Sequence, residues 1–132
     1  MSALRVEAYF QQLRSLIEAN PLVASFNVAY DRRSTYEGFV YGELHLVDGS
    51  VLHVREYVDV ETAIERLMYV YQYLDAAGAF VFRYDNTGHH KKLKLPTYPH
   101  HKHDSSEENV VAAKARDLIG VLEEIEQVIQ LE

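Results

Sequence analysis

The sequence predicts an α+β fold, in which an antiparallel β-sheet meander of about five strands packs with an N-terminal and a C-terminal helix. Apolar residues recur with a helical period at both ends of the chain, whereas residues 22–84 show a period of two. Turn residues separate the alternating segments, as in a hairpin-rich sheet. The 132 residues, 48% of them hydrophobic, contain no repeat and no long linker, so we expect one domain over residues 1–132.

The N-terminal helix is predicted over residues 3–19. Ser2 is a suitable cap, and Asn20 and Pro21 end the helix because proline cannot continue it. One side of this helix is apolar and is expected to face the sheet; it consists of Leu4, Ala8, Leu13, Leu16 and Ile17.

The strands of the sheet are predicted at residues 26–30, 39–47, 51–58, 64–74 and 79–84. The fourth of them is the least clear, because residues 61–68 alone would also suit a helix. Its tyrosines and β-branched residues favour a strand that begins near Ile64.

The C-terminal helix is predicted over residues 107–131, where the helical period returns, with Ser105 or Ser106 as cap. Residues 110–129 carry more apolar side chains than one side of a small sheet needs. A homodimer formed through this helix is therefore a further expectation.

The loop between the second and third strands predicts how they pair. With Asp48, Gly49 and Ser50 as a three-residue loop and Gly49 in the left-handed conformation, Leu46 lies opposite Leu52. One face of the hairpin is then apolar. The other face is a polar ladder, made of Tyr41, Glu43 and His45 with His53, Arg55 and Tyr57.

The same register places Glu56 opposite Gly42 on the apolar face of the hairpin, between Val54 and Val58. A carboxylate there either pairs with a cation such as Arg83, leans out to solvent, or has a pKa raised towards that of a general base. Both a structural and a catalytic role are therefore open for Glu56.

The composition excludes several classes of protein. The chain has no cysteine, so it forms neither disulfides nor thiolate metal sites. No apolar run approaches the roughly 20 residues of a membrane helix, and the N-terminus lacks the apolar core of a signal peptide. We therefore expect a cytoplasmic protein that does not enter the membrane.

Residues 83–103 form a basic, histidine-rich segment, which we call the histidine strip. The whole chain has a net charge of −7, yet in this strip five lysine and arginine residues accompany one acidic residue, Asp85. Such a local inversion of charge indicates a site for an anion. Five of the seven histidines of the chain lie here, namely His89, His90, His100, His101 and His103.

The strip is expected to be an irregular loop that begins with a turn. Asp85, Asn86 and Gly88 suit an Asx-type turn, in which short polar side chains bond to nearby backbone groups. Pro96 and Pro99 then keep the chain extended, so that it can double back. The two groups of histidines can therefore converge.

The first interpretation of the strip is metal-independent cleavage of RNA by acid–base catalysis, which needs no cofactor. A histidine or Glu56 takes the proton from the ribose 2′-hydroxyl, and another histidine protonates the leaving oxygen. A carboxylate orients or activates a histidine. The candidate catalytic residues are His89, His90, His100, His101, His103, Asp85 and Glu56. The candidate substrate-binding residues are Arg83, Lys92 and Lys102 for phosphate, Tyr84 and Tyr98 for base stacking, and Asn86.

Two other interpretations remain open. In one, the histidines and Asp85 or Glu56 bind a divalent metal, because imidazole and carboxylate are common ligands. No zinc-specific spacing occurs, however, and the lysines of the strip would repel a cation. In the other, the strip is a non-enzymatic module that docks an acidic partner protein, and its histidines satisfy loop carbonyls.

Several motifs together resemble a known family. They are DGS at 48–50, REYVDV at 55–60, FRYDN at 82–86, HH at 89–90 and LPTYPHHKH at 95–103. From about Gly38 to the C-terminal helix, the chain is similar to the TumE-type family, the toxin half of bacterial type II toxin–antitoxin pairs. The resemblance implies a small cytoplasmic protein restrained by a cognate antitoxin with a helix-turn-helix DNA-binding domain. This chain has Thr87-Gly88 where the family typically has Ala-Pro, and a more basic link follows.

Overall fold

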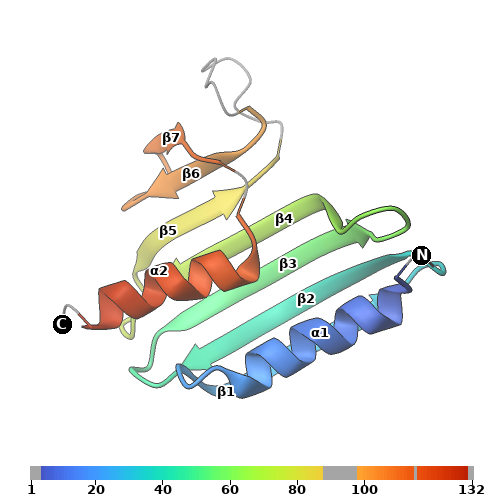
Figure 1. Ribbon diagram of the computed structural model, residues 1–132. Coiled ribbons are helices and arrows are strands. Elements are labelled where there is room, and N and C mark those ends of the chain that lie inside the picture. The colour runs from blue at the N-terminus through green and yellow to red at the C-terminus, as the bar shows by residue number, and fades with distance from the viewer. Residues whose placement is uncertain (1–3, 88–97, 115, 131–132) are drawn as a thin grey trace.

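The computed structural model describes residues 4–87, 98–114 and 116–130. Within them a single antiparallel sheet carries both helices on one of its faces (Figure 1). The elements in chain order are α1 (Val6–Ala19), β1 (Val23–Arg32), β2 (Glu37–Leu46), β3 (Val51–Asp59), β4 (Glu65–Leu74), β5 (Phe80–Asp85), β6 (His101–Asp104), β7 (Val110–Ala112) and α2 (Leu118–Gln130). The α+β class and the meander are confirmed, since each strand pairs with its neighbour in the chain.

The predicted number of strands was wrong, because the described residues form seven strands rather than about five. All five expected strands are present, and β4 begins at Glu65, close to the expected boundary. The additional strands are β6 and β7, which pair antiparallel beyond β5. Residues 101–103 of the histidine strip thus belong to the sheet and not to an irregular loop.

The predicted start of the C-terminal helix was also wrong, since α2 begins at Leu118 and not at residue 107. Val110 and Val111 instead pair with β6, a role that suits β-branched residues. Asp117 takes the place of the expected serine cap, because its Oδ1 accepts a hydrogen bond from the Gly120 amide at 2.9 Å.

The N-terminal helix agrees with its predicted end, because Asn20 is the C-cap residue of α1. The helix begins at Val6, preceded by Arg5, whose side chain makes no cap hydrogen bond. Ser2, the expected cap, lies outside the described residues. No helix in the described residues combines the length and the apolar character required to cross a membrane.

The pairing of β2 with β3 differs by two residues from the prediction. The loop is Val47-Asp48-Gly49, so Leu44 lies opposite Leu52. Gly49 has the expected left-handed conformation, with a φ of 88°. A shift of two residues leaves every side chain on its predicted face, because the strand period is two.

The two faces of the sheet differ in what covers them. The face under α1 and α2, which we call the covered face, holds the apolar core with residues such as Leu44, Val54, Tyr71 and Phe82. The opposite face, the open face, has no described helix over it. Alternate residues of these strands therefore project onto a face that no described helix removes from water.

The close approach of β1 and β2 generates a prediction about stability. A Cβ atom added at Gly42 would lie 2.1 Å from the backbone oxygen of Asn27, whereas one added at Gly78 would meet nothing within 4 Å. Gly42→Ala is expected to lower the free energy of unfolding by about 3 kcal/mol or more, because backbone atoms must move. Gly78→Ala, the control, should cost only about 1–2 kcal/mol for its left-handed φ.

Urea denaturation followed by circular dichroism measures both values. Equal losses in the two variants would contradict the close approach of β1 and β2 at Gly42.

Candidate functional site

The strand registers bring polar residues of four strands to one region of the open face. Residues that lie opposite one another on adjacent strands form two rows across the sheet. Within a row, successive residues are about 4.8 Å apart, which is the distance between neighbouring strands. One row runs from β3 to β6 through His53, Gln72, Arg83 and His103. The next row runs through Arg55, Val70, Asp85 and His101.

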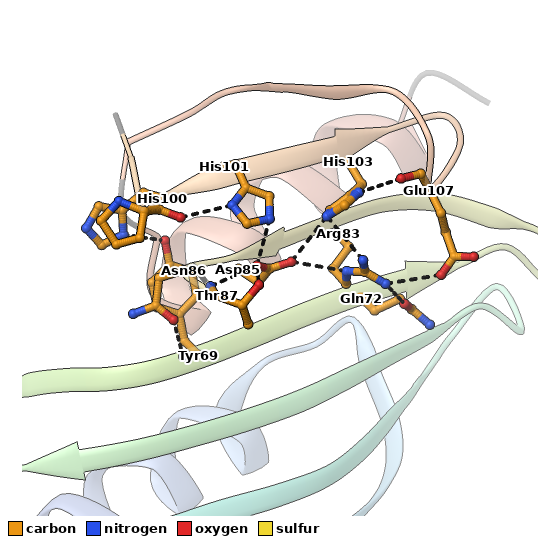
Figure 2. A network of polar contacts seen from close by, with 11 residues as sticks. Tyr69, Gln72, Arg83, Asp85, Asn86, Thr87, His100, His101, His103 and Glu107 are labelled. Carbon is orange, nitrogen blue, oxygen red and sulfur yellow. Dashed lines mark hydrogen bonds and ion pairs between the residues drawn. The ribbon is translucent and has the colours of Figure 1, made fainter. Parts of the chain in front are cut away.

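Asp85 is the centre of this region, with 2% of its surface exposed (Figure 2). Its Oδ1 accepts hydrogen bonds from the Thr87 amide at 3.0 Å and the Thr87 hydroxyl at 2.8 Å. These bonds confirm that an Asx-type turn begins at Asp85. Arg83 Nε donates to Oδ2 at 3.2 Å, and the Nε2 atoms of His101 and His103 lie 2.8 Å and 3.4 Å from the carboxylate. A buried carboxylate is thus surrounded by donors and imidazoles.

Backbone carbonyls determine which nitrogen of each imidazole carries hydrogen. Nδ1 of His101 lies 2.9 Å from the Pro99 oxygen, and Nδ1 of His103 lies 2.7 Å from the Glu107 oxygen. A carbonyl only accepts, so both Nδ1 atoms must donate. Both Nε2 atoms consequently point towards Asp85.

The two imidazoles then differ at Nε2. Nη2 of Arg83 lies 3.1 Å from Nε2 of His103 and can only donate, so this Nε2 is a lone-pair acceptor and His103 is neutral. Nε2 of His101 faces an oxygen of Asp85, an acceptor, and the contact requires a proton or a cation between the two atoms. Either a proton or a cation between Nε2 of His101 and Asp85 would make this contact favourable.

The environment of His103 agrees with its neutral state. Burial lowers the pKa of His103 from its ordinary value of 6.5, and the positive charge of Arg83 lowers it further, whereas the hydrogen bond to the Glu107 carbonyl raises it. The net direction is downward, so His103 carries no charge at pH 7.

A pocket of about 330 Å³ opens on the open face beside Asp85. Asp85, Arg83 and Thr87 form one wall, and His53 and Arg55 of β3 form the other. Val70 and Gln72 of β4 lie between the walls as the floor. His101 and His103 are each 2% exposed and lie behind Asp85, towards the edge of the sheet.

Five residues that line this pocket were absent from the sequence-based candidates, namely His53, Arg55, Val70, Gln72 and Thr87. The hairpin pattern had placed His53 and Arg55 on the polar ladder without relating that ladder to the strip. The missing signal was the order of the strands, because β4 lies between β3 and β5 and brings the ladder next to Arg83 and Asp85.

Glu56, a predicted catalytic residue, lies on the covered face, with none of its surface exposed. Its carboxylate accepts a hydrogen bond from the Tyr71 hydroxyl at 2.6 Å and another from the Tyr9 hydroxyl. Arg66 Nε is 3.6 Å away. Burial and the charge of Glu56 raise the pKa of both tyrosines, so these hydroxyls remain donors. The contacts tie α1 to β3 and β4, on the opposite side of the sheet from Asp85.

Tyr84 and Lys102 also lie on the covered face, away from the pocket. The Tyr84 hydroxyl donates to Glu124 of α2 at 2.5 Å, and Lys102 Nζ contacts the same carboxylate at 3.1 Å. These contacts hold α2 against the sheet. Tyr98, the other tyrosine expected to stack bases, is 42% exposed and does not line the pocket beside Asp85.

Asn86 directly follows β5 and His100 directly precedes β6. The Asn86 side chain bonds to the backbone of β4, accepting from the Tyr69 amide at 2.9 Å and donating to the Leu67 oxygen at 3.2 Å. His100 stacks on Tyr69, and its Nδ1 is 2.9 Å from the Tyr69 hydroxyl. Tyr69 and His100 line a second pocket together with Arg66 and Arg116. The remaining candidates, His89, His90 and Lys92, lie outside the described residues.

Asp85, His101 and His103 are also the side chains best placed to bind a metal ion. One donor atom from each lies within 4.8 Å of the others. Hydrogen bonds from both Nδ1 atoms to carbonyls direct both Nε2 atoms inward, as in many metal sites. Arg83 already donates to Asp85 and His103 in this structure, so an ion would have to displace its guanidinium group.

The hydrogen bonds of His103 yield a prediction for nuclear magnetic resonance. Long-range proton–nitrogen spectra at pH 7.5 are expected to show His103 with hydrogen on Nδ1 only, and its titration midpoint should lie below 6.5. Arg83→Gln should move that midpoint upward, because a nearby positive charge is removed. Spectra of His103→Asn identify the signals, and a midpoint at or above 6.5 in the unmodified protein would contradict the contacts described here.

Comparison with known proteins agrees with the motifs of the sequence. The family model described as Toxin TumE matches residues 13–131, nearly the whole chain. Neither a curated protein nor a solved structure matches significantly. Since the match spans the sheet, the Asp85 region and α2, the chain belongs to the Toxin TumE family.

Proposed function

We propose that this toxin-family protein cleaves RNA at the pocket beside Asp85, by acid–base catalysis that needs no metal. The observation that supports the proposal is the composition of the two walls. A carboxylate and an arginine on β5 face an imidazole and a second arginine on β3, across a floor of uncharged side chains. These are the groups that cleavage of a phosphodiester by a ribose hydroxyl requires.

The spacing of the walls suits this reaction. β3 and β5 are separated by one strand, so their backbones are about 10 Å apart. Their side chains project into the same pocket from opposite sides. A phosphodiester between the walls therefore has one proton-transfer group on each side, as in-line displacement at phosphorus requires.

Arg55 and Arg83 are the proposed phosphate ligands. Both line the pocket and carry permanent charge, which stabilises the extra negative charge that develops on phosphorus. Hydrogen bonds to Gln72 and Glu107, at 3.2 Å and 3.1 Å, orient Arg83. The strip thus supplies one arginine to the anion site, while its Lys102 binds α2.

Asp85 is the proposed proton acceptor and His53 the proposed donor. Asp85 takes the proton from the 2′-hydroxyl, the 2′-oxygen bonds to phosphorus, and the bond from phosphorus to the 5′-oxygen breaks. His53 then protonates that oxygen, leaving a 2′,3′-cyclic phosphate and a 5′-hydroxyl. Behind His53, Glu43 Oε2 lies 3.7 Å from Nδ1, which leaves Nε2 for the substrate. His101 positions Asp85 from behind, and His103 accepts a hydrogen bond from Arg83, which itself donates to Asp85.

Two substrates, assayed in EDTA, separate the proton roles. A uridine dinucleotide has an alkoxide leaving group that needs a proton, whereas uridine 3′-(4-nitrophenyl phosphate) has one that does not. His53→Ala is expected to lower kcat/KM on the dinucleotide by about 100-fold or more. On the ester, the same variant should keep most of the kcat/KM of the unmodified protein. Asp85→Asn should be impaired on both substrates, because each requires loss of the 2′-hydroxyl proton.

His45→Ala is the matched control for His53→Ala. Both histidines are exposed on the open face, at 46% and 42%, and both contact Glu43, but only His53 lines the pocket. The control should keep full activity, and thermal melts should show that all three variants fold. Equal losses for His53→Ala on both substrates would remove His53 as the proton donor.

A second candidate function is metal-dependent cleavage, and the convergence of Asp85, His101 and His103 favours it. It predicts that chelator-treated protein binds one Zn²⁺ per chain in calorimetry, and that His101→Ala abolishes binding while His45→Ala does not. Cleavage restored only by Zn²⁺ or Mn²⁺ would replace the metal-free mechanism with this one. Binding without any effect on the rate would make the ion structural.

The proposed partner is an antitoxin, as membership of a toxin family suggests. A helix-turn-helix domain in that antitoxin, and a homodimer through α2, stay predictions. Ile119 of α2 is 49% exposed and is the residue at which a dimer contact through this helix would be tested.

A further inference from the structure

Three aromatic rings lie next to one another on the open face of β2 and β3. Phe39 lies 5.1 Å from Tyr41 and 6.4 Å from Tyr57, measured between ring centroids. Tyr41 is 43% exposed, so a large apolar ring is presented to solvent. We call these three residues the aromatic platform. The helices do not cover it, because they lie on the other face of the sheet.

The aromatic platform adjoins the pocket beside Asp85. Next to that pocket is another hollow of about 510 Å³, which is lined by Phe39, Tyr41 and Asn27 together with His53 and Arg55. His53 and Arg55 line both hollows. The register places Tyr41 opposite Arg55, in the same row as Asp85. The two hollows therefore form a continuous surface across β2–β5.

We propose that the aromatic platform binds the bases of a single-stranded RNA segment whose phosphate enters the pocket beside Asp85. This inference rests on the proposed function, since it takes the cleaved substrate to be RNA. It adds the conformation of that substrate and the residues that hold it outside the cleaved bond.

The chemistry of the surface favours single-stranded RNA as its occupant. Unstacked bases bind to exposed aromatic rings, whereas the bases of a duplex are already stacked on one another. The guanidinium of Arg55 lies over the Phe39 ring at 5.6 Å, so a positive charge for the backbone phosphate stands beside the rings. Glu43, the acidic residue at the rim, contacts His45 at 3.0 Å and His53 at 3.7 Å, which balances its charge when these histidines are protonated.

The geometry also explains why the expected stacking residues are not the ones used here. Tyr84 donates to Glu124 on the covered face, and Tyr98 lines neither hollow. Tyr41 lies three strands from Asp85, about 14 Å, so a base on its ring belongs to a nucleotide near the reacting phosphate. The surface thus accommodates a short segment on one side of the cleaved bond.

Binding is tested with a fluorescent, eight-nucleotide 2′-O-methyl RNA, which lacks the reactive hydroxyl and remains intact. Tyr41→Ala is expected to raise its dissociation constant about 10-fold, and Tyr41→Phe to leave it nearly unchanged, because the ring and not the hydroxyl stacks on a base. Phe26→Ala is the matched control, since Phe26 is 44% exposed but projects from the covered face of β1. A duplex of the same sequence should bind more weakly than the single strand.

Cleavage assays with the same variants separate this inference from the proposed function. Tyr41→Ala should lower kcat/KM on an eight-nucleotide RNA through KM, with little change on the dinucleotide. Equal binding by Tyr41→Ala and Phe26→Ala, no binding of the single strand, or equal binding of the duplex would overturn the platform, even if the dinucleotide is cleaved. Binding that depends on Tyr41 without any cleavage would overturn the enzymatic function and leave the platform as an RNA-binding surface.

Discussion

The rest of the structure depends on the alternation of side chains along strands of one sheet that is covered on a single face. Every strand from β2 to β5 contributes one set of residues to the core under α1 and α2 and the other set to the open face. The open set cannot be apolar throughout, because no described helix removes it from water. A sheet of this kind can carry a polar site at little cost to its core, since the core and the site use different residues of the same strands.

The two buried carboxylates illustrate this division. Glu56 is enclosed by Tyr9, Tyr71 and the nearby Arg66, so its charge stabilises the packing of a helix on the sheet. Asp85 is equally buried but borders a pocket, and its partners are an arginine, a threonine and two imidazoles. Removing the partners of a buried charge costs several kcal/mol, about 3–5 by general experience, so both clusters also constrain the fold. Their surroundings differ in access, because Glu56 is enclosed by the core whereas Asp85 borders the pocket on the open face.

Sequence periodicity was sufficient to predict the fold class, α1, the first five strands and the side of the sheet on which Glu56 lies. It failed at β6 and β7, because His101 and His103 look like loop residues until pairing with β5 places them beside Asp85. Tyr84 and Lys102 were also predicted as site residues, but both project to the covered face, because neighbouring residues in a strand project to opposite faces. His53 and Arg55 belong to the site through the order of strands, a long-range property that local patterns do not contain.

The pairing of β5 with β6 has a consequence for how this protein can diverge from its relatives. Asp85 faces His101 and Arg83 faces His103 because backbone ladders fix their positions, whatever chain joins the two strands. Substitutions or length changes in that connection, such as the basic residues between His90 and Leu95, can therefore accumulate without displacing the paired residues. Sequence change in this connection is therefore compatible with a constant arrangement of Arg83, Asp85 and the two histidines that face them.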